Sequence, residues 1–358
     1  MEHVGIDLGS RTSHICVRAE DGAVEYEGRL RTGELAMWLK HRGRCRVLLE
    51  TCNEAFMVAD LVAEGGHDVR VVPAAVVRQL GVGYRGVKND VRDARVLSKS
   101  SVALGDELPR VHVPSLESRR RQLLLTQRGG LVKARTQLVN GVKSHLRAEL
   151  LQVGTGSTSA FPRRARELLA DHEELLAMME PTLEAIERLT ASIQQLEKLV
   201  KERTKADPQV RLLKTMPGVG ALTATAFVAA VDDIGRFESA AQMASYFGLT
   251  PGENTTGGKQ RFTGVTKAGK TQVRTLLVQA AWTLVRVAPP SALAQSYQQL
   301  VQRRPKQVAI VALARRMVCV LFAMMRDQLP FDPRPRPCTR TDELAQALRA
   351  EQRSTNAT

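Results

Sequence analysis

The first hundred residues alternate between short apolar segments typical of strands and segments in which apolar residues recur at helical spacing. Apolar alternation, with the turn at Asp21-Gly22, predicts three strands in succession. Helix and strand then alternate to about residue 98, which indicates an α/β domain built on a mixed sheet. The predicted strands are Val4–Leu8, His14–Arg18, Val24–Leu30, Cys45–Glu50 and Asp68–Pro73, and the predicted helices are Gly33–His41, Glu54–Ala63, Ala75–Leu80 and Asn89–Ser98.

The remainder of the chain has helical periodicity. A basic helix is predicted over 116–150 and a second long helix over Pro162–Lys205, ended by Asp207-Pro208. The second helix carries a 3,4 spacing of apolar residues that is typical of a coiled coil, and the same spacing suits a hairpin within one chain. That seam consists of Ile186, Leu189, Ile193, Leu196 and Val200.

These patterns predict α/β plus all-α architecture in four parts. Residues 1–150 form the α/β domain and end in the basic helix, and 151–206 form a coiled-coil helical segment. Residues 207–330 form a mostly helical domain, and 331–358 form a proline-rich, loosely ordered tail. Three strands followed by alternating helix and strand is the order of a ribonuclease-H-like fold, although periodicity alone allows other mixed sheets.

The distribution of charge points to a polyanionic partner. The chain has 52 Lys and Arg against 37 Asp and Glu, a net charge of +15. Residues 1–110 hold 16 of each sign, so the whole surplus lies after them. Aromatic residues make up only 4%, which favours duplex or folded nucleic acid held by its phosphates over stacked single strands.

Other features argue against secretion and against a membrane location. The five cysteines are scattered and form no CxxC pair, so a disulfide framework or zinc ribbon is not expected. The start of the chain lacks the pattern of a signal peptide, and the apolar run Met317–Met325 is too short to span a bilayer. We expect a cytoplasmic protein.

Four carboxylates are candidates for a metal site. Asp7 and Glu50 each end a predicted strand, and Asp90 and Asp93 lie three apart at the start of a predicted helix, on one face. Four clustered carboxylates repel one another unless cations neutralise them, so the set predicts Mg²⁺ or Mn²⁺ ions that act on a phosphate. Taken singly, each fits an ordinary surface or capping residue better than a metal ligand, and Asp90 in particular fits a helix N-cap. His14 and His112 are interpreted as ordinary strand or loop histidines.

The start of the chain has a second interpretation. Gly5-Ile-Asp-Leu-Gly9 resembles the first phosphate loop of actin-like kinases and ATPases. The nearest second loop, Asp233-Ile-Gly235, follows a helical stretch instead of opening a strand, so ATP binding is disfavoured.

A glycine-rich, basic region in the second half is a candidate phosphate-binding site. Its glycines would let backbone N–H groups approach a phosphate, and its basic side chains would supply the opposite charge. The region contains Gly257, Gly258, Gly264, Lys259, Lys267, Lys270 and Arg274. The turn that includes Gly218 and Gly220 resembles a helix-hairpin-helix that holds duplex phosphate, or is an ordinary capped helix start.

Together these segments resemble the IS-one-ten family of insertion-sequence transposases. Asp7, Glu50 and Lys88-Asn-Asp90-Val-Arg-Asp93-Ala-Arg95 resemble its DEDD signature, carried by a domain similar to the RuvC junction resolvase. The segments that resemble its C-terminal transposase domain are Met216-Pro-Gly-Val-Gly220, Phe237, Ser245-Tyr-Phe-Gly-Leu-Thr-Pro251, Thr256-Gly-Gly-Lys259, Gly264-Val-Thr-Lys-Ala-Gly269 and Arg274-Thr-Leu-Leu-Val-Gln-Ala-Ala281. The resemblance implies a recombinase guided by a structured RNA, the bridge RNA, that pairs with donor and target DNA. It also implies a homo-oligomer, either a dimer or a tetramer.

One position departs from the family pattern. The family has a serine nucleophile where this chain has Thr256. A threonine hydroxyl is chemically competent, although its methyl group stiffens the side chain. Three interpretations stay open: Thr256 attacks DNA, Thr255 replaces it, or strand transfer is impaired.

Three functions therefore compete. The first is an RNA-guided DNA recombinase with a composite site of metal-bound carboxylates and a hydroxyl nucleophile. The second is a metal-dependent Holliday-junction-type nuclease in which water attacks. The third is a catalytically impaired, transposase-derived nucleic-acid-binding protein.

Overall fold

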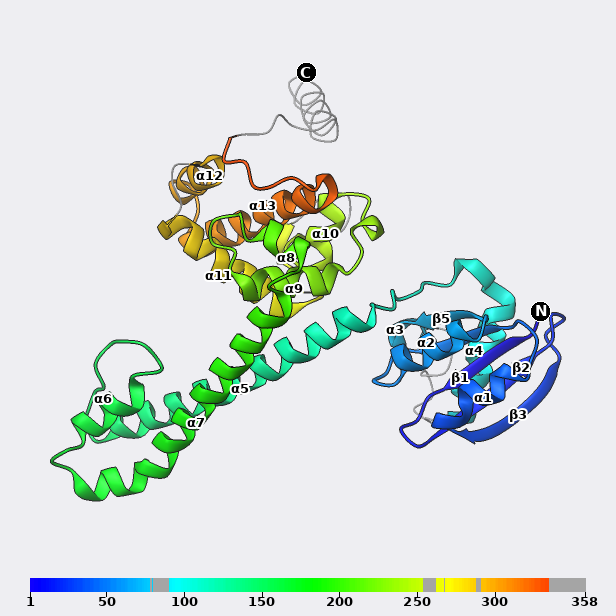
Figure 1. Ribbon diagram of the computed structural model, residues 1–358, viewed down its shortest axis with the longest axis horizontal. Coiled ribbons are helices and arrows are strands. Elements are labelled where there is room, and N and C mark those ends of the chain that lie inside the picture. Colours follow the sequence, from blue (N-terminus) through cyan, green and yellow to red (C-terminus); the bar gives the residue numbers. More distant parts are fainter. Residues whose placement is uncertain (78, 80–89, 254–261, 267, 288–290, 335–358) are drawn as a thin grey trace. The chain divides into compact units, whose positions relative to one another are not determined.

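The computed structural model divides into two compact units, residues 1–115 and 116–358 (Figure 1). It describes the chain except for residues 78, 80–89, 254–261, 267, 288–290 and 335–358. The part of the predicted tail from residue 335 onward therefore lies outside the described residues. The 33-residue basic helix expected to end the first domain belongs to the second unit, because it packs on helices of that unit.

The first unit is built on a five-stranded mixed sheet of order β3-β2-β1-β4-β5. The first three strands pair antiparallel, and β4 and β5 run parallel to β1. The α/β prediction is confirmed, and the strand order is consistent with a ribonuclease-H-like domain. The strands are β1 (His3–Asp7), β2 (Thr12–Arg18), β3 (Val24–Arg31), β4 (Arg46–Glu50) and β5 (Asp68–Val72).

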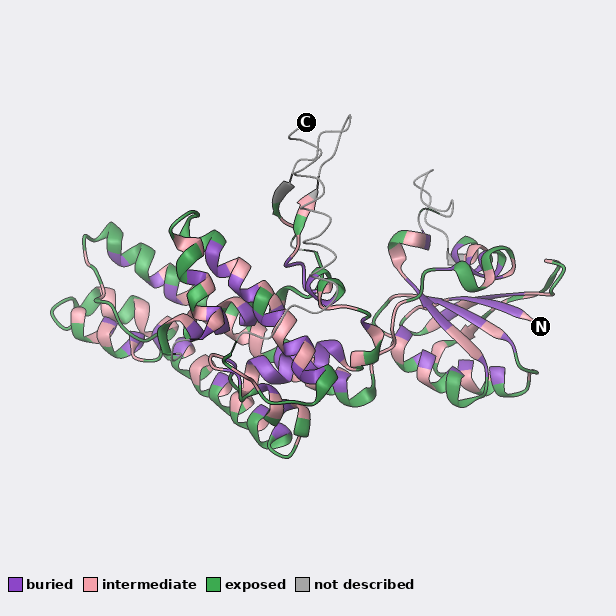
Figure 2. Cartoon of the chain, turned by 90° about the horizontal axis from the view of Figure 1, so that it is seen from above, coloured by how far each residue is buried: buried purple, intermediate pink, exposed green. Residues whose placement is uncertain are grey.

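Helices cover both faces of this sheet (Figure 2). Side chains alternate along each strand, so Ile6 and Ile15 face α1 (Leu35–Lys40) and α2 (Ala55–Glu64) in one core. Gly5 lies on the opposite face, against α4 (Asp90–Leu104). A short helix, α3 (Ala74–Val77), follows β5, and the 3₁₀ turns Thr32–Glu34 and Gly105–Glu107 precede α1 and follow α4.

The second unit contains a long antiparallel pair of helices, α5 (Leu116–Ala148) and α7 (Glu173–Thr204) (Figure 1). Arg128 pairs with Glu197 at 2.7 Å, and Arg135 donates to the Thr190 hydroxyl at 3.3 Å. Three residues of the apolar seam of α7, Ile186, Ile193 and Val200, are buried within this chain, and Leu189 and Leu196 are half-buried. Ile186 packs with Val142 and Leu146 of α5. The structure therefore shows the hairpin within one chain, one of the two alternatives that the spacing allowed.

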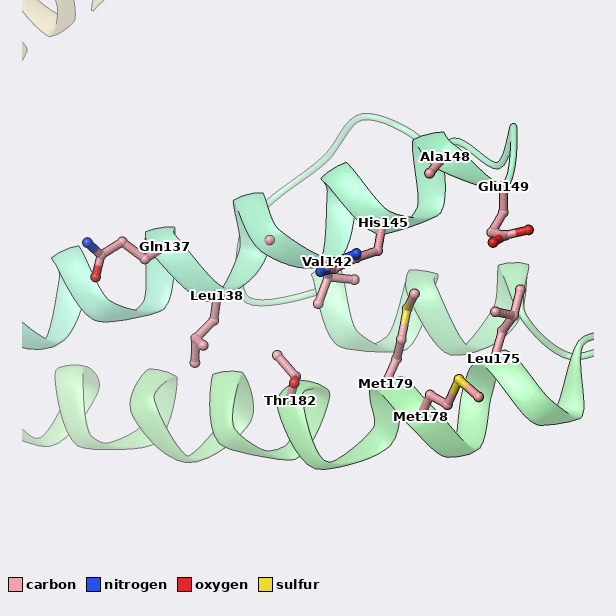
Figure 3. Close-up of a pocket in the computed structure, with 11 residues that line it drawn as sticks. Gln137, Leu138, Val142, His145, Ala148, Glu149, Leu175, Met178, Met179 and Thr182 are labelled. Carbon is pink, nitrogen blue, oxygen red and sulfur yellow. The ribbon is translucent and has the colours of Figure 1, made fainter.

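The predicted helix over Pro162–Lys205 is interrupted. It begins as α6 (Phe161–Leu168), stops, and restarts as α7. Phe161 and Leu169 are buried against the end of α5, and this contact turns α6 back on the hairpin without any glycine in the sequence to mark the break. Near this end, a hollow of about 540 Å³ opens between α5 and α7, lined by Leu175, Met178 and Met179 among others (Figure 3).

The rest of the unit packs around one apolar core of helices and a two-stranded hairpin. Phe227 and Phe247 lie at its centre, with ring centroids 5.1 Å apart. Among the described residues one helix, α13 (Lys306–Asp327), is long and apolar enough to cross a membrane by length and composition alone; 56% of its most apolar window is buried inside the protein. The elements are α8 (Pro208–Leu213), α9 (Ala221–Val231), the 3₁₀ turn Ile234–Arg236, α10 (Ala240–Tyr246), β6 (Pro251–Glu253), β7 (Phe262–Val265), α11 (Thr271–Val287), α12 (Ala292–Val301) and α13 (Lys306–Asp327).

Candidate functional site

Asp7 and Glu50 end two neighbouring parallel strands. Ile6 is in register with Leu49, so the next residue of each strand is a carboxylate at the same level of the sheet. Both are partly exposed, whereas the residues before them are buried. The predicted placement of two carboxylates at one sheet edge is present in the structure, and both side chains lie on the face that α4 covers.

Helix α4 runs antiparallel to β1, which brings its first turn to the same edge. The His3 ring lies 2.8 Å from the Ser101 hydroxyl, near the end of α4. Gly5 lies beside Ala94, near its start. Asp93 is 7% exposed and precedes Ala94 directly, so it lies at the Asp7 end of β1. Asp90 is the first residue of α4, and its side chain is outside what the structure describes.

The fit of these residues to a divalent cation rests on their chemistry and their backbone placement. Carboxylate oxygens are the ligands that Mg²⁺ and Mn²⁺ prefer, and three carboxylates lie at one end of one sheet face. Among the residues whose side chains are described, no group of three His, Cys, Asp or Glu has the geometry of a metal site. The carboxylate oxygens suit Mg²⁺ or Mn²⁺, and their coordination of one ion stays a prediction.

The turn that follows Asp7 is fixed by Thr32. The Thr32 N–H donates to the Arg11 carbonyl at 2.9 Å, and its hydroxyl donates to the Gly9 carbonyl at 2.6 Å. A Cβ on Gly9 would lie 2.3 Å from the Thr12 carbonyl oxygen, so the turn requires glycine there. Thr32, which the sequence did not single out, therefore orders the backbone next to Asp7.

The loop expected to carry the nucleophile connects β6 and β7. Pro251 pairs with Val265, and the Thr266 N–H donates to the Thr250 carbonyl at 3.0 Å. The predicted site residues Thr256, Gly257, Gly258, Lys259 and Lys267, with the alternative Thr255, lie outside the described residues. Ser245 lies in helix α10.

Two glycines next to this hairpin let backbone segments touch. A Cβ on Gly248 would lie 1.9 Å from the Ala268 carbonyl oxygen, and one on Gly269 would lie 2.1 Å from the Tyr246 carbonyl oxygen. Both residues have positive φ, which glycine adopts without strain. The motif glycines therefore hold the segment before α11 against the end of α10.

The basic residues at the start of α11 have different surroundings. Arg274 donates to the Phe247 carbonyl at 3.1 Å and the Ala268 carbonyl at 3.2 Å, so its guanidinium fastens the same two segments. Desolvation by the surrounding chain and nearby Arg236 lower the pKa of Lys270, although the residue is exposed. Lys270 is thus a cation held beside another cation, an arrangement that an incoming phosphate would relieve.

The two glycines of the turn before α9 differ as well. Gly218 has φ of +86°, and its Cβ would lie 2.4 Å from the Ala280 carbonyl oxygen of α11, so its lack of a side chain serves packing. Gly220 is the exposed N-cap of α9, with nothing within 4 Å of a Cβ position. Of the two, Gly220 has the open backbone that a phosphate contact requires.

A mixed sheet with carboxylates at the ends of two parallel strands is the arrangement expected of a DEDD-type transposase domain. Residues 4–149 match the DEDD transposase model for IS110 elements, and residues 210–298 match the model described as transposase, IS116/IS110/IS902 family. The first match extends to residue 149, close to the predicted end of the first domain. The chain belongs to the IS116/IS110/IS902 family of transposases.

Curated relatives of this chain are also named as transposases. A probable family 20 transposase of Pseudomonas aeruginosa is 28% identical over 93% of this chain and 99% of its own length. The transposase for insertion sequence element IS1111A of Coxiella burnetii is 26% identical over 91% of this chain and 90% of its own. The putative transposase y4qE of Sinorhizobium fredii is 31% identical over 78% of this chain and 71% of its own.

Proposed function

We propose that this transposase cuts DNA with a metal-bound set of four carboxylates, Asp7, Glu50, Asp90 and Asp93, and rejoins it with a hydroxyl nucleophile. One observation supports the proposal. The carboxyl ends of strands β1 and β4 and the first turn of α4, which carry these carboxylates, lie at the same end of one sheet face. These residues would hold Mg²⁺ or Mn²⁺, and the chemistry that the bound ion supplies is polarisation of a phosphate oxygen.

The chain's own contribution is to place the phosphate. Gly9 has no side chain, and the Thr32 hydroxyl holds its carbonyl in place. The turn next to Asp7 is therefore ordered and leaves room for a DNA backbone to approach. The first unit is neutral, and the surplus of +15 lies in the second unit, which we propose grips duplex DNA and a structured guide RNA through their phosphates. The protein would work in the cytoplasm, with the chromosome as its target.

We assign the nucleophile to Thr256 on the β6–β7 loop. The support is its place in the motif that the family match covers, between the two strands of the hairpin that precedes the basic start of α11. Attack of a DNA phosphate by the Thr256 oxygen forms a protein–DNA phosphodiester, releases the leaving 3′ or 5′ hydroxyl, and passes the threonine proton to solvent or a base. A homo-oligomer would let carboxylates and hydroxyl come from different subunits.

The test of the carboxylate site is cleavage of a labelled DNA substrate by full-length protein with its co-purified RNA. Asp7→Asn and Glu50→Gln should remove cleavage without lowering the thermal midpoint, and excess chelator should do the same to the wild type. Glu64→Gln, an exposed carboxylate of the same unit, is the matched control. Undiminished cleavage by Asp7→Asn would contradict the proposal.

A junction nuclease is the second candidate, favoured by the same carboxylates if water attacks. It cuts DNA without a covalent protein–DNA adduct, so trapping that adduct on a denaturing gel separates the two. Sequencing of RNA that purifies with the protein tests the guide: a single structured species that pairs with both DNA partners is expected, and its absence would remove the RNA from the proposal. A protein that binds nucleic acid but neither cuts nor forms an adduct would be the impaired, binding-only form.

A further inference from the structure

A row of polar side chains crosses the sheet from Asp7, at the carboxyl end of β1, to the outer strand β3. Asp7 on β1 lies opposite His14 on β2, and His14 lies opposite Arg29 on β3. Residues directly opposite in antiparallel strands share a face, with Cβ atoms about 4.5–5.5 Å apart. Arg29 and His14 therefore share the face of Asp7.

The guanidinium of Arg29 is held in place without being neutralised. Its Nε and Nη2 donate to the Thr12 hydroxyl at 3.0 and 2.6 Å. Thr12 lies two residues before His14, on the same face. Among the described residues Arg29 forms no ion pair. Its guanidinium is therefore held by the neutral Thr12 hydroxyl and keeps its full positive charge.

The neighbouring charges do not cancel it. Glu27, two residues before Arg29, is bound by both arms of Arg95 from α4 at 2.5 and 2.6 Å. Arg31, two residues after, meets Glu34 only at 3.6 Å, with both side chains largely exposed. The carboxylate closest along the strand is thus already paired, and the positive charge of Arg29 faces solvent.

The surface is open on this side. β3 is the edge strand of the sheet, and Arg29 and Arg31 are exposed. Two strand spacings separate β1 from β3, about 10 Å. DNA rises about 3.4 Å along its axis per nucleotide, so a phosphate about three nucleotides from the one at Asp7 would reach Arg29.

We infer that Arg29, positioned by Thr12 and flanked by His14, forms a phosphodiester-binding site that continues the carboxylate edge across β2 and β3. The ligand is the backbone of the DNA strand being cut. This inference rests on the proposed carboxylate site, because it takes the direction of the strand from Asp7. Thr12 is a positioning residue: it acts on DNA through Arg29.

The experiment measures DNA binding by full-length protein in the presence of chelator, where no cleavage occurs. The dissociation constant of a fluorescent duplex is followed by anisotropy over a series of salt concentrations. Arg29→Gln should lower the slope of log affinity against log salt by about 0.7–0.9, the value of one phosphate contact. Arg44→Gln removes an exposed arginine beside the start of β4, at the opposite end of the sheet from Asp7, and should leave the slope unchanged.

Thr12→Val separates position from charge. It keeps the net charge of the chain but removes the hydroxyl that holds Arg29, so the slope should fall part of the way towards that of Arg29→Gln. Equal slopes for Arg29→Gln and the wild type would overturn the inference, as would an equal fall in Arg44→Gln or an unchanged slope in Thr12→Val. Thermal midpoints confirm that each variant is folded. Since no divalent ion is present, failure of the carboxylates to cut DNA would leave this measurement unaffected.

Discussion

Gly5 on β1 lies so close to Ala94 on α4 that a Cβ on the glycine would be 2.2 Å from the alanine carbonyl oxygen. The same Cβ would be 2.4 Å from the Ser98 nitrogen, so backbone meets backbone on two sides. No side-chain rotation can relieve this overlap, and any larger residue must push α4 off the sheet.

Gly5→Ala should therefore destabilise the first unit by at least about 1–3 kcal/mol, the usual cost of overpacking. The rate of DNA cleavage should also fall, by more than the loss of folded protein explains, because a displaced α4 moves Asp90 and Asp93. Thermal unfolding and DNA cleavage are measured side by side, with Gly33→Ala as control, because nothing lies within 4 Å of a Cβ there. A Gly5→Ala protein with a wild-type midpoint would show that α4 does not seat on β1 as described.

Acid should loosen the other end of the same helix. Arg46 and Arg70 each form ion pairs with Asp68 on β5 and with Asp106, which lies just after the end of α4. Burial acts against ionisation of Asp68, but hydrogen bonds from Arg70 and Arg46 outweigh it and lower its pKa. The hydrogen bond from Arg70 also lowers the pKa of Asp106. A lowered carboxyl pKa stabilises the folded state above the unfolded-state pKa, and that stability is lost as pH falls through the folded-state value.

The thermal midpoint should thus be steady near neutral pH and drop below about pH 4, where an unfolded aspartate takes up its proton. Asp68→Asn should start with a lower midpoint and lose less of it on acidification. Glu64→Gln, on the exposed end of α2, should follow the wild-type curve. Parallel curves for Asp68→Asn and the wild type would show that this network does not carry the acid sensitivity.

Gly218 and Gly220 should respond differently to the same substitution. Gly218→Ala combines a left-handed backbone with contact against α11, so the midpoint should fall by several degrees. Gly220→Ala has open space and should leave the midpoint within a degree or two, while its methyl group weakens duplex binding at the start of α9. Wild-type DNA affinity in Gly220→Ala would remove the phosphate contact from this turn.

Thr256 carries the strand-transfer proposal. Thr256→Ala should abolish recombination between paired donor and target plasmids, together with any covalent adduct, while RNA binding is kept. Thr256→Ser should keep activity and can raise it, since the methyl group that crowds an in-line attack is gone. Thr255→Ala and Ser245→Ala are the controls: loss of recombination in one of them alone would move the nucleophile there.

Local patterns were enough to predict the elements of the first unit. The Asp21-Gly22 turn and the alternation around Val24 gave the meander, and the apolar run before Glu50 gave a buried strand that ends in a carboxylate. The break after Leu168 could not be foreseen, because it depends on the burial of Phe161 and Leu169 against α5, residues distant in sequence.

The same limit applies to the candidate site. Asp7 and Glu50 could be found because strand ends are visible in the sequence. The row through His14 and Arg29 was not predicted, because it depends on the register of three strands, which the hydrophobic pattern and the geometry of both connecting turns set together. His14 was therefore interpreted as an ordinary strand residue, although it lies directly opposite Asp7.

The pairing of α5 with α7 limits how the length of this protein can change. Moving seven residues along α5, from Arg128 to Arg135, is matched by moving seven back along α7, from Glu197 to Thr190. An insertion in only one helix would rotate its apolar face away from the partner by 100° per residue, whereas seven residues added to both would restore nearly the same faces. Each paired addition would carry α6 about 10 Å further outward. Relatives that differ in hairpin length should therefore differ by matched additions close to a whole number of helical turns, about seven, eleven or eighteen residues in each helix.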